Sequence, residues 1–123
     1  MCIRDRKNIR EDTFLVSVML ANNEIGVIQP IENISKICKS RGITFHSDFA
    51  QCLGYMPLDN LLSDVNMITM SSHKIYGPKG IGLLLIDEEI NLEPLIVGGG
   101  QEYGLRSGTV SYTHLTLPTI LRV

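Results

Sequence analysis

The chain has 123 residues, the length of one domain, and combines 44% hydrophobic with 20% charged residues, which is typical of a soluble globular protein. No apolar stretch approaches the ~20 residues that span a bilayer, and the start lacks the apolar core of a secretory signal, so we expect no membrane partner. A net charge of −2 argues against a nucleic-acid partner held by phosphate contacts. The three cysteines lack CxxC spacing, which excludes a disulfide framework and a zinc site. We therefore expect a protein of the reducing cytoplasm without a metal.

The two ends of the chain differ from its middle. Met1–Arg6 reads MCIRDR and residues 111–119 read SYTHLTLPT, and neither has the periodicity of a packed element. One back-translation of MCIRDR has a reverse complement that encodes VSYTH, which is the sequence of residues 110–114. A sequencing adapter joined to both sides of a genomic fragment would give this result. We therefore predict that residues 1–6 and 110–123 are not native, and that residues 7–109 are an internal piece of a larger domain.

The middle of the chain alternates between strand and helix patterns. The apolar, β-branched run at residues 13–20 predicts a buried strand. Apolar residues at helical spacing predict a helix over residues 31–41 that ends at Gly42. The elements predicted next are a strand over residues 43–46 that ends at Asp48, a helical turn over 58–62, and strands over 65–70 and 82–86. This order predicts an α/β layer architecture with largely buried strands.

Three polar clusters follow predicted strands. They are Asn22-Asn23-Glu24, Asp48 with Gln51, and Ser71–Lys74. Because ligands of α/β sheets bind outside the carboxyl ends of the strands, this shared placement indicates a functional edge.

Lys74 allows two interpretations. A lone lysine after a strand commonly begins a surface turn, but a partly desolvated amine can form a Schiff base with a carbonyl compound. In the second case, Gly77, Pro78 and Gly80 would shape a tight turn that lets the backbone approach a bound group. Ser71 and His73 are close enough in sequence to donate to a phosphate.

Asp48 also has two interpretations. It caps the following turn, or its carboxylate keeps a pyridinium nitrogen protonated. Gln51 would reach the same side if a helix begins at Asp48, whereas His46 is interpreted as a packing residue at the end of a strand. The glycine-rich residues 98–108, with Arg106, form a flexible loop or an anion site, but they match neither nucleotide-binding fingerprint.

Four motifs occur in order: ANNEIGVIQPI, HSDFAQ, MSSHKIYGPKGIG and GGGQEYGLRSGT. Together they resemble the central cofactor-binding stretch of the NifS/IscS-type cysteine desulfurases, which are class V aminotransferase-like enzymes. The resemblance covers nearly all of residues 13–109. It implies part of the large domain of the fold-type I pyridoxal-phosphate enzymes, with a mixed, mostly parallel sheet and flanking helices. The implied cofactor is pyridoxal 5'-phosphate.

The resemblance also implies a role for each matching residue. Lys74 would bond to the cofactor and move the substrate proton, and Asp48 would pair with the pyridine nitrogen. The other implied cofactor contacts are Ser71 and His73 to the phosphate, Gln51 and Asn23 to the ring hydroxyl, and Thr109 to the phosphate of a dimer partner's cofactor. Phe49 stands where the family usually has a small residue, and Arg106 matches a motif position without a firm role.

The implied reaction converts L-cysteine to L-alanine and leaves the sulfur on an enzyme cysteine as a persulfide. The sulfur then passes to an acceptor or iron–sulfur scaffold protein, and the parent enzyme would be a homodimer. In the family, the persulfide cysteine lies downstream of the Thr109 position, and neither Cys38 nor Cys52 matches it. We therefore predict that this chain alone is inactive. The alternatives are another class V enzyme (a selenocysteine lyase or an aminotransferase), a non-catalytic scaffold that binds pyridoxal phosphate, and a truncated reading frame.

Overall fold

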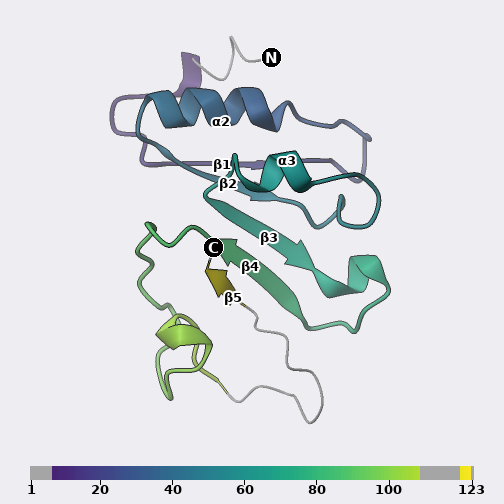
Figure 1. Ribbon diagram of the computed structural model, residues 1–123, viewed down its shortest axis with the longest axis vertical. Helices are drawn as coiled ribbons and strands as arrows, with labels where there is room; N and C mark the ends of the chain where they lie inside the picture. Colours follow the sequence, from purple (N-terminus) through teal and green to yellow (C-terminus); the bar gives the residue numbers. More distant parts are fainter. Residues whose placement is uncertain (1–6, 109–119, 123) are drawn as a thin grey trace.

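The computed structural model describes residues 7–108 and 120–122 and confirms the predicted α/β architecture (Figure 1). Each predicted strand and helix is present, with ends that move by at most two residues. In chain order the elements are β1 (Leu15–Met19), α2 (Ile31–Ser40), β2 (Thr44–Asp48), α3 (Asp59–Leu62), β3 (Met67–Ser71), the 3-10 helix η1 (Ser72–Ile75), β4 (Gly82–Ile86), the 3-10 helix η2 (Glu102–Gly104) and β5 (Ile120–Arg122).

The strands form one sheet in the order β1-β2-β3-β4-β5. β1 is parallel to β2 and β2 to β3, β4 runs antiparallel to β3, and β5 is parallel to β4. The sheet is therefore mixed and mostly parallel, as the resemblance implies. β5 lies within residues 110–123, whose non-native origin stays a prediction.

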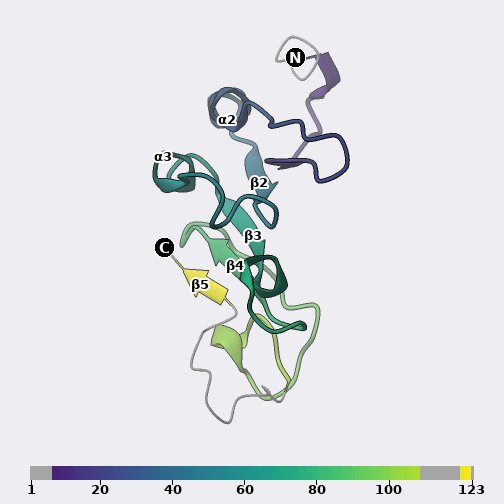
Figure 2. The ribbon, with the colours of Figure 1, turned by 90° about the vertical axis from the view of Figure 1, so that its right-hand side faces the viewer.

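One face of the sheet carries the main core. Side chains alternate between the two faces of a strand, so Phe45 and Phe49 of the β2 region point to the same face as Ile68 of β3. All three are almost fully buried, with relative exposures of 1%, 0% and 2%. The apolar stripe of α2 packs on this face, because Ile31, Ile34 and Cys38 belong to the same cluster. Figure 2 shows α2 and α3 on the same side of the sheet.

The other face is polar over β1 and β2. Its polar side chains include Ser17, His46 and Asp48, while Leu15 and Met19 of β1 are its apolar members. A smaller apolar cluster around Met67 and Ile86 covers this face only over β3 and β4. The expectation of largely buried strands is therefore wrong for β1, where Leu15 is 39% exposed. β1 has a strand neighbour on one side only, and in the described part of the chain no helix covers its polar face.

We expect the Phe45→Ala substitution to destabilise the fold by about 3–5 kcal/mol, because it leaves a cavity between the sheet and α2. The matched control is Phe14→Ala, since Phe14 is 82% exposed and its truncation should change the free energy of unfolding by no more than about 0.5 kcal/mol. Urea denaturation of both variants measures the difference. Equal losses would contradict this assignment of the core.

Candidate cofactor site

The parallel register brings the three polar clusters to one edge of the sheet. Met19 lies beside Asp48, and Asp48 lies beside Thr69, in a single row across β1, β2 and β3. The segments that follow these strands therefore start side by side, and Figure 1 shows them at the right-hand edge of the sheet. The predicted common placement of the clusters is confirmed.

Lys74 is held in a short turn after β3. The chain enters η1 at Ser72, and the backbone N–H of Gly77 donates to the Ser72 carbonyl over 3.0 Å. A Cβ at Gly77 would crowd the Ser72 hydroxyl and lie 3.0 Å from the Ser72 carbonyl oxygen, so a larger residue would strain this turn. Lys74 is half-buried, and within the described residues its Nζ has no hydrogen bond or ion pair. Its amine is thus available to a ligand at this edge.

Ser71 and His73 form a hydrogen-bonded pair beside Lys74. The Ser71 Oγ lies 2.8 Å from Nδ1 of the exposed His73 ring. When the hydroxyl donates to Nδ1, the Nε2–H group is left to donate to an anion. The pair is therefore compatible with the phosphate contacts that the resemblance implies.

Asp48 caps the following turn, as one of its two interpretations predicts, and keeps one oxygen that is compatible with the other. Its Oδ1 accepts from the backbone N–H of Ala50 over 2.7 Å, which is the predicted cap of the following turn. Its Oδ2 has no hydrogen-bond partner among the residues that the structure describes, and is open to a ring N–H. The backbone around Asp48 is fixed on both sides, because its carbonyl accepts from the Leu20 N–H and the Phe49 N–H donates to the Thr69 carbonyl, each over 2.9 Å.

The helix that would carry Gln51 to the side of Asp48 is absent. Residues 50–55 form turns instead, closed by the Cys52 N–H on the Phe49 carbonyl. The condition attached to Gln51 is therefore not met, although Gln51 still follows β2 and is half-buried. Phe49, the departure from the family pattern, points into the core and leaves the polar face free.

The asparagines after β1 have different surroundings. Asn22 Oδ1 accepts from the backbone N–H groups of Glu24 and Ile25 and so closes the turn. Asn23 is exposed, and its side chain makes no hydrogen bond within the described part of the chain. Thr109 lies outside the described residues, so its role stays a prediction. Arg106 is exposed, and its Nη1 donates to the Ser107 carbonyl over 3.1 Å, which is a local contact.

His46 has contacts that a packing interpretation does not capture. Its Nδ1 lies 2.7 Å from Ser17 Oγ on β1, and its Nε2 lies 3.2 Å from Thr69 Oγ1 on β3. Burial lowers the pKa of His46, and the Asp48 carboxylate partly opposes this shift. Strand alternation, which places residues 46 and 48 on one face, was the available sequence signal.

Neither described cysteine suits the persulfide role. Cys38 and Cys52 are both 1% exposed, and burial raises the pKa of each thiol. Arg41 partly opposes the shift at Cys38, whereas Asp48 adds to the shift at Cys52. A raised pKa disfavours the thiolate, which is the nucleophilic form of cysteine. Both residues are therefore buried core residues, as expected for Cys38.

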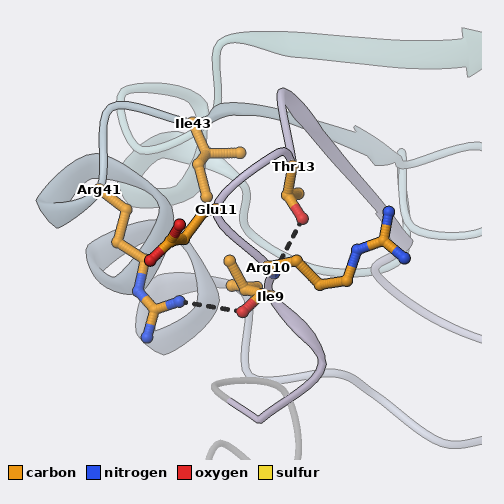
Figure 3. Close-up of a pocket in the computed structure, with 6 residues that line it drawn as sticks. All are labelled: Ile9, Arg10, Glu11, Thr13, Arg41 and Ile43. Carbon is orange, nitrogen blue, oxygen red and sulfur yellow. Dashed lines mark hydrogen bonds between the residues drawn. The ribbon is translucent and has the colours of Figure 1, made fainter.

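A separate hollow of about 430 Å³ lies beside the chain segments that precede β1 and β2 (Figure 3). In it, the Arg41 guanidinium donates to the Ile9 carbonyl over 3.3 Å, and Arg10 is paired with Asp12. This hollow does not include the predicted site residues. Within residues 7–108 and 120–122, no group of side chains could hold a metal ion, and no helix has the length and apolar character of a membrane span.

The fold and this edge define an α/β domain of the kind that binds ligands at the carboxyl ends of its strands. The chain belongs to the class-V aminotransferase family, whose model matches residues 2–119. It is 56% identical over 106 residues to the mitochondrial cysteine desulfurase of Arabidopsis thaliana, covering 85% of this chain and 23% of the relative. It is 52% identical over 104 residues to the cysteine desulfurase IscS of Rickettsia rickettsii, covering 83% of this chain and 25% of the relative.

Solved structures agree with this family assignment. A NifS-like protein superimposes with a TM-score of 0.82 at 44% sequence identity, over 90% of this chain and 31% of that chain. A protein described as SspA in complex with cysteine gives a TM-score of 0.81 at 41% identity, over 90% of this chain and 33% of that chain. The chain thus spans about a quarter of the length of the curated relatives that it matches.

We expect an NMR titration to place the pKa of His46 below its ordinary value of 6.5, and the Asp48→Asn substitution to lower it further. The unfolded chain then binds a proton at a higher pH than the folded chain does. The stability that His46 contributes is therefore complete above pH 6.5 and is lost as the pH falls through the window between the two pKa values. A His46 pKa above 6.5 would contradict this account.

Proposed function

We propose that this edge of the sheet binds pyridoxal 5'-phosphate, and that the chain is the cofactor-binding part of a cysteine desulfurase. The proposed enzyme converts L-cysteine to L-alanine and leaves the sulfur on an enzyme cysteine, for delivery to a sulfur acceptor or iron–sulfur scaffold protein. One observation carries the proposal. The Lys74 amine and Oδ2 of Asp48, which have no hydrogen-bond partner among the described residues, lie at the ends of neighbouring parallel strands on the same edge.

The residues at this edge suit the cofactor's functional groups. In this proposal, the Lys74 amine holds the aldehyde carbon and later moves the proton at the substrate carbon, while Asp48 keeps the ring nitrogen protonated. When bound, the cofactor withdraws electrons from the substrate. His73 donates a ring N–H to the phosphate, and the Ser71 hydroxyl turns from His73 Nδ1 to the phosphate when the cofactor binds. Asn23 and Gln51 hydrogen-bond the ring hydroxyl; the Asn23 amide does not take part in the turn that Asn22 closes. Thr109 contacts the phosphate of a partner subunit's cofactor.

The names of the relatives support the desulfurase assignment. The curated relatives cited above are named cysteine desulfurases, and one structural neighbour was solved in complex with cysteine. We extend to this chain the L-cysteine substrate, a homodimeric parent and a role in iron–sulfur cluster assembly. The free buried thiols of Cys38 and Cys52 suit the reducing cytoplasm, although some relatives are named mitochondrial.

Trapping the bound cofactor tests the site directly. The chain is mixed with pyridoxal 5'-phosphate and reduced with borohydride, and the labelled peptide is identified by mass spectrometry. We expect one label, on Lys74, and at least about a tenfold loss of label in Lys74→Ala, because a site-held amine reacts ahead of free surface lysines. The matched control is Lys79→Ala, which removes an exposed lysine from the same loop. Equal labelling of all lysines would refute the proposed site.

The chain alone should not form alanine. Supplied with pyridoxal 5'-phosphate and L-cysteine, it is expected to release no alanine above the level given by free cofactor. The physical reason is that Cys38 and Cys52 are buried, and burial raises the pKa of each thiol and so disfavours its nucleophilic thiolate form. Turnover by protein purified free of host enzymes, measured by amino-acid analysis, would show that another nucleophile is present.

A further inference from the structure

His46 uses both of its ring nitrogens to join three strands. Ser17 Oγ lies 2.7 Å from Nδ1, and Thr69 Oγ1 lies 3.2 Å from Nε2, so the ring connects β1, β2 and β3 on the polar face. Ser17 is directly opposite His46 in the β1–β2 ladder, whereas Thr69 is reached diagonally. Three polar side chains from separate parts of the sequence therefore form one hydrogen-bonded row.

This row lies next to the Asp48 carboxylate. Residues 46 and 48 are on the same face of β2, and two residues along a strand span about 6.6 Å. Thr69 is the ladder partner of Asp48. The hydroxyl that His46 holds thus belongs to the residue beside Asp48 on the neighbouring strand.

The two distances favour one arrangement of protons. A neutral imidazole has one donor and one acceptor. The shorter distance, to Ser17, suits a hydroxyl donating to Nδ1, and the longer one, to Thr69, suits Nε2–H donating to Oγ1. With its oxygen engaged as an acceptor, the Thr69 hydroxyl keeps its own hydrogen for a second bond toward the carboxylate side of the ladder.

We propose that His46, acting through Thr69, is a positioning residue for the Asp48 carboxylate: it holds the Thr69 hydroxyl so that its hydrogen is available to that carboxylate when the cofactor ring is bound. This inference rests on the proposed function. A histidine that only tied the strands together would affect stability and leave cofactor affinity unchanged. The core that holds these strands to α2 lies on the opposite face, so packing of the sheet does not depend on a polar row on this face.

Three substitutions separate the two roles. Thr69→Val removes the hydroxyl and keeps the shape, Thr69→Ser restores the hydroxyl, and Thr44→Val makes the same change on the same face of β2, two residues before His46. Cofactor affinity is measured by absorbance titration, and stability is measured in parallel by denaturation. We expect Thr69→Val to weaken cofactor binding about tenfold, the equivalent of one net hydrogen bond. Thr69→Ser and Thr44→Val should stay within about twofold of the parent chain.

The ring-nitrogen chemical shifts of His46 give an independent measurement on the unsubstituted chain without cofactor. We expect a neutral ring with the proton on Nε2 at neutral pH. A proton on Nδ1, or on both nitrogens, would overturn the proposal even if Thr69→Val fails to fold.

The outcomes distinguish this inference from the proposed function. If the unsubstituted chain takes up cofactor at Lys74 and Thr69→Val binds it as well as Thr44→Val does, the positioning role is wrong and the proposed function stands. If the unsubstituted chain takes up no cofactor at Lys74, the proposed function fails, and the positioning role falls with it.

Discussion

The parallel register of β1, β2 and β3 is the constraint on which the candidate site depends. It sets Met19, Asp48 and Thr69 in one row, so that whatever follows each strand emerges at the same edge. Parallel neighbours require a crossover connection. Between β1 and β2 this connection is α2, which is held to the sheet by its buried apolar stripe. Packing on one face of the sheet thus determines which polar groups meet at its edge.

The HSD motif of β2 shows how one strand serves both faces. Ser47 is fully buried on the α2 side, where its Oγ donates to the Val18 carbonyl over 2.7 Å. His46 and Asp48 point to the other face. Because side chains alternate along a strand, Ser47 bonds β2 to β1 on one face while His46 and Asp48 are left on the face where a ligand could bind. A shift of the register by one residue would exchange these roles, so the buried aromatic residues of the strand also secure the orientation of the site.

The order of the elements could be predicted because it depends on local patterns: apolar runs, helical spacing and Gly42. The contacts of His46 could not, since Ser17 is 29 residues away and Thr69 is 23, and only the strand register brings them together. The condition that a helix begin at Asp48, on which the placement of Gln51 depended, could not be checked from the sequence for a related reason. Burial of Phe49 and the Ala50 N–H on Asp48 close a turn there instead. Asn22 and Asn23 are adjacent and chemically identical, so their different roles follow only from the turn geometry.

The placement of Lys74 depends on a strained turn. Tyr76 adopts a left-handed conformation with φ of 63°, which costs a bulky residue about 1–3 kcal/mol, and its side chain is 98% exposed and gains little from packing. The conformation persists because the chain must turn back at this point. Gly77 closes on Ser72, and the Ser72 N–H donates to the Ile81 carbonyl just before β4. Since β4 pairs antiparallel with β3, this strained turn both starts the return strand and fixes the lysine at the edge where the parallel strands end.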